Sequence, residues 1–223
     1  MVGLRADGTI EIACAQKWAT PIFTARDPHH GELAPRWIEL FHGLATPEQS
    51  SPHAPLAKSA LYESRFDLLS RSDPALQRLR AFCEGALLEV VHQLNARHWP
   101  PDTTVRIEMR ESWFHLTRDG GYHDVHSHSM CSWCGIYYVA CAGCRVRPPN
   151  GVNRFYDPRP GVEAYHDFGT AYLNAETGWD IPPEDGLLVL FPSYLRHSAL
   201  PYFGERERVV VAFNAAVTRA PRA

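Results

Sequence analysis

The apolar residues of this chain follow a helical spacing in its first part and a strand-like pattern in its second part. Apolar positions within 35–44 recur every three or four residues, which predicts a short amphipathic helix. Ser72-Asp73-Pro74 is a helix start signal, and the same spacing then continues to Asn95. We therefore expect a second, long helix with one apolar face packed across a sheet.

After residue 100 the pattern changes to short strands and turns. The segment 105–117 alternates well enough to be a strand with Trp113 on its inward face. Asp119-Gly120-Gly121 predicts a turn, and hence a hairpin or a closely related connection with the segment that follows it. Further strands are expected at 135–140, 153–157, 186–191 and 208–217. Helices first and strands afterwards favour a mainly β fold, an antiparallel double-sheet barrel with flanking helices.

Composition places few further limits on the protein. With 223 residues, 45% hydrophobic and 21% charged, we expect one domain over 1–223, in which 1–100 is mostly helical support and 101–223 is the barrel core. A net charge of −3 provides no basic face for nucleic acid and no polybasic membrane anchor. The N-terminal stretch has no long apolar run after a basic start, so a cytoplasmic location is expected.

Histidines at strand ends provide the candidate chemistry. His126 and His128 are two residues apart, so on a strand they point to one face about 6–7 Å apart, within reach of one metal ion. His197 follows another apolar run far downstream, and Arg208 opens the last strand. A strand-borne His-x-His, a distant histidine and a nearby arginine together indicate a mononuclear iron site with an anion anchor.

From Thr20-Pro21 to Phe213-Asn214, the sequence resembles a family of bacterial 2-oxoglutarate- and Fe(II)-dependent oxygenases related in fold to prolyl 4-hydroxylases. The motifs that carry the resemblance are His126-x-His128, SWCGIYY at 132–138, Asp157-Pro158-Arg159, GLLVLFPSYLRH at 186–197 and RVVVAFN at 208–214.

The resemblance implies a fold and a reaction. The fold would be a double-stranded β-helix, or jelly roll, that holds one Fe(II) with His126, His128 and His197. Arg208 would bind the distal carboxylate of the cosubstrate 2-oxoglutarate. With O2, the enzyme would hydroxylate or otherwise oxidise a C–H bond of a small molecule or peptide side chain and release succinate and CO2. The resemblance does not fix the oligomeric state, and a homodimer is compatible with it.

The second ligand position departs from the commoner pattern of the wider superfamily, in which a carboxylate follows the first histidine. Three neutral imidazoles would leave a ferrous site at +2 and strengthen its attraction to a dianionic cosubstrate. Asp124 keeps an alternative open, because 124, 126 and 128 alternate onto one face of a regular strand. Asp124 with His126 would then supply the usual pair, and His128 would take a supporting or substrate-binding role.

Other side chains are assigned by strand parity. Tyr138 has the parity of the histidine pair and Asn214 that of Arg208, so both are candidates for the cofactor pocket. Trp113 and Arg159 are candidate substrate contacts, although Trp113 also suits a core and Arg159 also suits a turn cap. His115 is expected either in the pocket or at the surface, and His123 at the surface. The loop 158–183 is expected to cover the substrate.

Two Cys-x-x-Cys pairs leave other functions open. Cys131 and Cys134, then Cys141 and Cys144, have the spacing of a zinc site. The residues between the pairs carry no turn signal, and an intervening strand would separate them by roughly 23 Å. The alternatives to the oxygenase are therefore a zinc-binding interaction module built on these pairs, and a three-histidine cupin-type dioxygenase that uses no 2-oxoglutarate.

Overall fold

The computed structural model describes residues 3–4, 10–11, 19–51, 58–141, 144, 149–159 and 178–219. Its helices are α1 (His30–Leu44), α2 (Pro74–Asn95) and the short 3-10 turns η1 (Pro47–Gln49) and η2 (Leu68–Ser70). Its strands are β1 (Gly3–Leu4), β2 (Ile10–Glu11), β3 (Phe23–Arg26), β4 (Lys58–Glu63), β5 (Val105–His126), β6 (Trp133–Ala140), β7 (Asn153–Tyr156), β8 (Gly178–Ile181), β9 (Leu187–Pro192), β10 (His197–Tyr202) and β11 (Arg208–Arg219).

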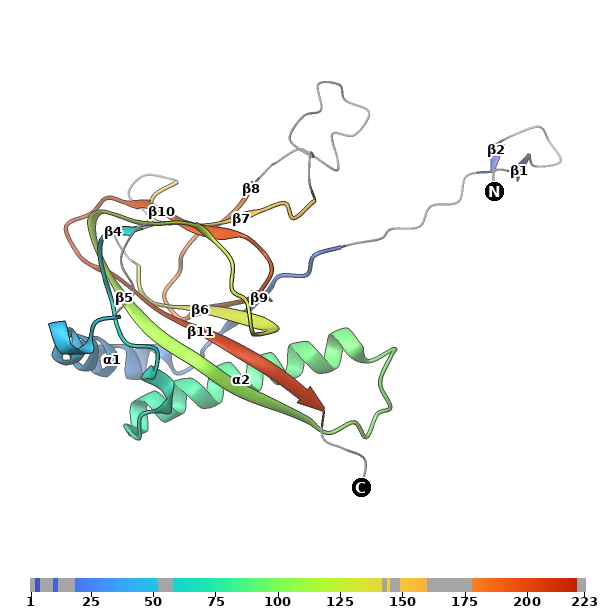
Figure 1. Cartoon of the computed structure of the whole chain (residues 1–223), viewed down its shortest axis with the longest axis horizontal. Coiled ribbons are helices and arrows are strands. Elements are labelled where there is room, and N and C mark those ends of the chain that lie inside the picture. Colours follow the sequence, from blue (N-terminus) through green and yellow to red (C-terminus); the bar gives the residue numbers. More distant parts are fainter. Residues whose placement is uncertain are drawn as a thin grey trace.

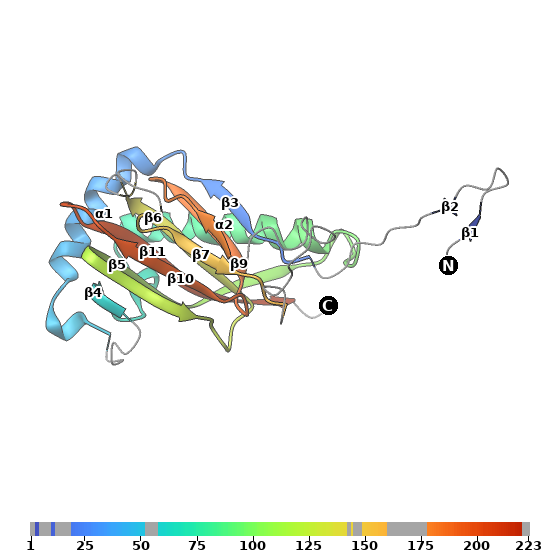
Figure 2. The same cartoon turned by 90° about the horizontal axis from the view of Figure 1, so that it is seen from above.

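The main body is a nine-stranded antiparallel sheet in the order β3-β9-β6-β11-β5-β10-β7-β8, with β4 paired to β5. The sheet curls, so that β10 and β7 lie above β6 and β11, while α1 and α2 cover the opposite face (Figure 1). Seen from above, the strands lie side by side over the long helix α2 (Figure 2). This arrangement confirms the predicted mainly β barrel-like fold with flanking helices.

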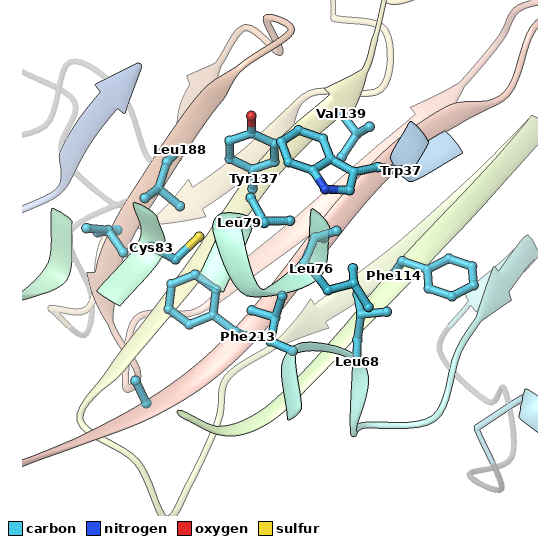
Figure 3. Close-up of a cluster of buried hydrophobic side chains, with 14 of the residues drawn as sticks. Trp37, Leu68, Leu76, Leu79, Cys83, Phe114, Tyr137, Val139, Leu188 and Phe213 are labelled. Carbon is cyan, nitrogen blue, oxygen red and sulfur yellow. The ribbon is translucent and has the colours of Figure 1, made fainter. Parts of the chain in front are cut away.

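Helix α2 begins where the sequence predicts. Its N-cap is Asp73, whose Oδ1 accepts hydrogen bonds from the backbone N–H groups of Ala75 and Leu76 at 2.8 and 3.4 Å, and Pro74 occupies the first turn. The buried stripe of the helix, which includes Leu76, Leu79 and Cys83, packs toward the sheet (Figure 3). None of the described helices combines the length and apolar character needed to span a membrane.

Strand alternation separates two apolar clusters. Tyr137 and Val139 of β6 and Phe213 of β11 face the helices, as Figure 3 shows, whereas Ile136 and Tyr138 face the inside of the curl. Phe213 of β11 lies opposite Gly135 of β6 in the sheet. Its ring requires glycine at 135, because a Cβ there would lie 2.2 Å from Cζ of Phe213. The inward-facing layer therefore forms the floor of an interior space, and the outward layer forms the main core.

The predicted hairpin at Asp119-Gly120-Gly121 is wrong. β5 continues through these residues as one strand to His126, paired with β11 in its first part and with β4 and β10 in its second. Gly120 accommodates the bend with φ of 75°. The strands β4, β8 and β10 were not predicted, because none of them has a continuous apolar run or a regular alternation of apolar and polar residues.

Candidate metal centre

Pairing of β10 with β5 brings the distant histidines together. His197, the first residue of β10, lies directly opposite His126, the last residue of β5, and His128 follows two residues later. One ligand nitrogen from each of the three rings lies within 4.8 Å of the others. The ring centroid of His126 is 4.3 Å from that of His197 and 5.1 Å from that of His128. The spacing is that of side chains arranged around one ion.

Backbone carbonyls orient two of these rings. Nδ1 of His126 lies 2.8 Å from the carbonyl oxygen of Asp124, and Nδ1 of His197 lies 3.0 Å from that of Leu195. A carbonyl only accepts, so each Nδ1 carries the proton and each Nε2 is left with a lone pair, which is the form that binds a metal.

Burial keeps the three imidazoles neutral. Desolvation, followed by the positive charge of neighbouring histidines, lowers the pKa of His126 and of His128 to about 4 and that of His197 to about 3. At neutral pH the cluster is therefore uncharged and available as ligands.

The side chain of Asp124 is not part of this group among the described residues. Asp124 is exposed, and its Oδ1 accepts from the backbone N–H of Val125 at 2.7 Å. The structure thus brings His128, and not Asp124, together with His126 and His197. Asp124 contributes through its backbone carbonyl, which holds the ring of His126.

The ring of His128 contacts a network of polar side chains, whereas the rings of His126 and His197 contact backbone carbonyls. Its backbone N–H donates to the carbonyl of Ser193 at 3.1 Å, and its Nδ1 lies 3.4 Å from Nδ2 of Asn214. Nδ2 of Asn214 also donates to Glu111 at 2.7 Å, and its Oδ1 accepts from the Cys134 thiol at 3.2 Å. Asn214, predicted in the cofactor pocket, therefore lies at the histidine end of the site.

Arg208 lies at the other end of the same strand face. Its side chain is buried, its Nη2 donates to Oδ1 of Asn153 at 2.7 Å, and its guanidinium stacks over the ring of Tyr138, 5.5 Å from the ring centroid. Tyr138 in turn donates to the same Asn153 oxygen at 2.8 Å. Nε of Arg208 is buried and has no hydrogen-bond partner among the described residues. An unpaired buried donor on a fixed guanidinium fits a carboxylate.

The two ends share one cavity of about 230 Å³. Its floor is the inward face of β11, where Val210 and Ala212 lie between Arg208 and Asn214. Arg208 and Asn214 are six residue steps apart along the strand, roughly 20 Å between their Cα atoms. Tyr138 is not among the residues that line the cavity; it lies beneath Arg208 and holds Asn153, a residue that the sequence analysis did not single out.

The assignment of His123 to the surface is wrong. Between the pairs His197 with His126 and Ala199 with His123, β5 advances three residues while β10 advances two, which is a bulge. The bulge turns His123 into the cavity, where its ring centroid is 4.1 Å from that of His126. Parity assumes a regular strand, and this irregularity is fixed by the partner strand.

Trp113 and His115 continue the wall of the cavity. Nε2 of His115 lies 3.0 Å from the indole Nε1 of Trp113 and 2.9 Å from a carboxylate oxygen of Glu63, which also pairs with Lys58. One ring nitrogen cannot accept from the indole and donate to the carboxylate at once. Burial alone would raise the pKa of Glu63, but its bonds to His115 and Lys58 outweigh burial and hold the pKa below its usual range.

The remaining predicted substrate contacts are Arg159 and the cover at 158–183. Arg159 pairs with Asp157, with 3.0 Å between Nε and Oδ1, and is not among the residues that line the cavity. The expected cover at 158–183 falls largely on 160–177, which lie outside the described residues.

The four clustered cysteines occupy opposite ends of β6. Cys131 and Cys134 lie at its start, and Cys141 and Cys144 follow its end. None of them belongs to a group of three possible metal ligands in the described part of the chain. The strand β6 separates the two cysteine pairs, as the sequence predicts. The structure therefore does not support a zinc site shared by the four cysteines.

A curled antiparallel sheet that encloses a histidine cluster and a buried arginine defines the class of double-stranded β-helix metalloproteins. Residues 111–214 match the model of the family described as "Putative 2OG-Fe(II) oxygenase", for which Fe(II) and 2-oxoglutarate are the typical cofactor and cosubstrate. The matched segment contains the three histidines and Arg208.

Solved structures share the fold at low sequence identity. A prolyl-4-hydroxylase from Pseudomonas putida has a TM-score of 0.56 at 16% identity, over 92% of this chain and 94% of that one. HygX from Streptomyces hygroscopicus, with nickel, 2-oxoglutarate and hygromycin B bound, has a TM-score of 0.55 at 13% identity, over 88% and 83%. The 2-oxoglutarate-dependent epimerase SnoN from nogalamycin biosynthesis has a TM-score of 0.59 at 11% identity, over 91% and 82%. No curated protein sequence matches this chain.

Proposed function

We propose that the protein is an Fe(II)- and 2-oxoglutarate-dependent oxygenase that oxidises a C–H bond of a small molecule or a peptide side chain. The observation that carries the proposal is one cavity with three convergent imidazoles at one end and a buried arginine with an unpaired donor at the other. The match of residues 111–214 to the family model supports the reaction class.

His126, His128 and His197 are the proposed ligands of the metal. Three neutral nitrogen donors that leave coordination positions open suit a ferrous ion that must also bind a keto acid. The carbonyls of Asp124 and Leu195 fix the first and third rings in the ligating form, so the protein reorganises little on metal binding. When bound, Fe(II) would activate O2, and 2-oxoglutarate would supply two electrons and become succinate and CO2.

Arg208 is the proposed anchor for the distal carboxylate of 2-oxoglutarate. Asn153 and Tyr138 hold the guanidinium in place before the cosubstrate arrives, which lowers the conformational entropy lost on binding. The apolar floor at Val210 and Ala212 suits the two methylene groups between the keto acid and the carboxylate. Burial strengthens the ion pair, because few waters compete for either partner.

The substrate would contact the wall formed by Trp113, His115 and His123. This wall combines flat aromatic surfaces with hydrogen-bonding nitrogens, which suits a polar substrate that presents one reactive carbon toward the histidines. The fold neighbours support either substrate class, since one is a prolyl-4-hydroxylase and another holds hygromycin B.

The unpaired Nε of Arg208 favours this function over a three-histidine dioxygenase without a keto acid, which needs no buried carboxylate anchor. The deciding experiment is anaerobic addition of 2-oxoglutarate to the Fe(II)-loaded protein. A weak visible charge-transfer band, absent with succinate, is expected for a keto acid bound to the metal. Full iron loading with no band would overturn the assignment of 2-oxoglutarate.

A further inference from the structure

One carboxylate in the wall of the cavity has no partner of opposite charge. The charged side chains that line the cavity are Lys58, Glu63, Glu111 and Arg208. Lys58 and Glu63 form an ion pair with each other, and Arg208 is the proposed partner of 2-oxoglutarate. Glu63 lies opposite His115 of β5, four residue steps from Glu111, which is roughly 13 Å between Cα atoms. Within the described part of the chain, Glu111 forms no ion pair.

A neutral amide holds Glu111 at the histidine end of the cavity. Nδ2 of Asn214 donates to Oε2 of Glu111 at 2.7 Å, and the two residues lie opposite each other in the pairing of β11 with β5. The same amide nitrogen lies 3.4 Å from Nδ1 of His128. The distance between Oε2 of Glu111 and Nδ1 of His128 therefore cannot exceed the sum of 2.7 and 3.4 Å, which is 6.1 Å. The amide fixes the carboxylate in place without neutralising it.

The arginine next to Glu111 in the sequence is engaged elsewhere. Nη1 of Arg110 donates to the carbonyl of Met130 at 3.0 Å, and its Nη2 lies 3.8 Å from Oε2 of Glu108. Arg110 and Glu111 point to opposite faces of β5, because successive residues of a strand alternate. The negative charge of Glu111 thus remains available to a ligand in the cavity.

Two aromatic rings lie beside this carboxylate. Trp113 shares the inward face of β5 with Glu111, and its ring centroid is 5.8 Å from that of His128. Phe66 is held against the same strand, since its carbonyl accepts from the N–H of Ser112 at 3.0 Å. The rings of Phe66 and Trp113 are 5.0 Å apart between centroids, and both line the cavity. Aromatic faces attract cations, so rings and carboxylate favour the same kind of ligand.

We propose that the substrate carries an amine that is protonated at neutral pH, which Glu111 binds as an ion pair while Trp113 and Phe66 pack against it. This inference deepens the proposed oxygenase function and rests on it. An uncharged substrate would gain no ion pair from Glu111, and an anionic one would be repelled. The oxidised carbon would be a close neighbour of the amine in the substrate, because the carboxylate lies within 6.1 Å of a proposed metal ligand.

The first test compares two probes of similar shape on the metal-free, full-length protein. Pentylamine is an ammonium ion at neutral pH, whereas 1-pentanol is neutral, and ligand-observed NMR gives both dissociation constants. The wild type should bind pentylammonium about five-fold more tightly than 1-pentanol, the size expected for an ion pair at an exposed carboxylate. Equal affinity for the two probes, or no binding of pentylammonium, would overturn the proposal.

Glu111→Gln removes the charge and keeps an oxygen that can accept from Asn214, so this variant should lose the preference for pentylammonium. The matched control is Glu108→Gln, an exposed carboxylate on the opposite face of β5, which should keep the preference. A Glu111→Gln protein that still prefers pentylammonium would exclude Glu111 as the binding group. Phe66→Leu should weaken pentylammonium about two- to five-fold and leave 1-pentanol unchanged. An unchanged affinity for both probes would overturn the aromatic contribution.

The second test places the bound amine relative to the metal. In protein loaded with Mn(II) and 2-oxoglutarate, the protons on the carbon next to the nitrogen of pentylammonium should relax faster than in protein loaded with Zn(II), because Mn(II) is paramagnetic. Mn(II) that binds without this effect would put the amine away from the metal and overturn the inference, while the proposed function stands. Failure of Mn(II) to bind would contradict the proposed function, whereas the probe preference of the metal-free protein still decides the cation site.

Discussion

His197 lies directly opposite His126 in the pairing of β10 with β5, and this single register position holds their imidazole centroids 4.3 Å apart. Two segments far apart in the sequence thereby present two neutral ring nitrogens to one point. The backbone, and not a flexible loop, fixes the relation, so the pair is preorganised for a metal ion.

Replacement of His126 or His197 by alanine should abolish iron binding while the fold persists, because both side chains lie at a cavity rather than in the core between α2 and the sheet. Loss of one of three ligands should exceed the roughly 100-fold effect of losing a supporting partner. Bound iron measured alongside thermal unfolding checks this. His92→Ala, on the exposed side of α2, is the control. Full iron occupancy in either variant would contradict the assignment.

The choice between His128 and Asp124 is decided by a second pair of variants. His128→Ala should lose iron, whereas Asp124→Asn should retain it, because only the backbone carbonyl of Asp124 holds His126. Equilibrium titration with Fe(II) under anaerobic conditions measures both. The reverse result, with iron retained in His128→Ala and lost in Asp124→Asn, would establish the carboxylate ligand set.

Substitution of Arg208 by glutamine should weaken 2-oxoglutarate binding without loss of iron. A charge-assisted hydrogen bond contributes about 1.5–3 kcal/mol, which corresponds to roughly a 10- to 100-fold rise in Kd. Anaerobic titration of the charge-transfer band gives the Kd. Arg118→Gln, an exposed arginine paired with Glu207, serves as the control and should leave Kd unchanged. An Arg208→Gln protein with the wild-type Kd would exclude Arg208 as the anchor.

The metal-free protein should lose stability as the pH falls from about 6.5 toward 4. An unfolded histidine titrates near 6.5, whereas burial lowers the pKa of His126 and His128 to about 4 and that of His197 to about 3. Between these values the unfolded chain binds more protons than the folded protein, so the free energy of unfolding decreases as protons are added. Above pH 6.5 these groups contribute no pH dependence.

Thermal unfolding in the presence of a chelator, measured across this pH range, checks the effect. His126→Ala should show a shallower decline than the wild type, because it lacks one of the three depressed groups and relieves the charge repulsion on the other two. Identical pH profiles for the two proteins would show that the histidine cluster does not control the acid stability.

Local sequence determined the elements whose signals are contained within a few residues. The Asp73 cap and the helical spacing specify α2, continuous apolar runs specify β6, β9 and β11, and the spacing of His126, His128, His197 and Arg208 indicates the candidate chemistry. These features depend on contacts within one turn or on alternation along one strand, so they can be predicted without knowledge of the partners.

Tertiary structure decided the features that depend on a partner strand. The pairing with β4 and β10 carries β5 through Gly120, and the bulge beside β10 turns His123 into the cavity against its expected parity. Pairing of β7 with β10 places Asn153 beside Arg208, and pairing of β11 with β5 places Asn214 beside His128. Hydrogen bonds between distant strands set register and bulges, and neither residue spacing nor periodicity encodes which strands will meet.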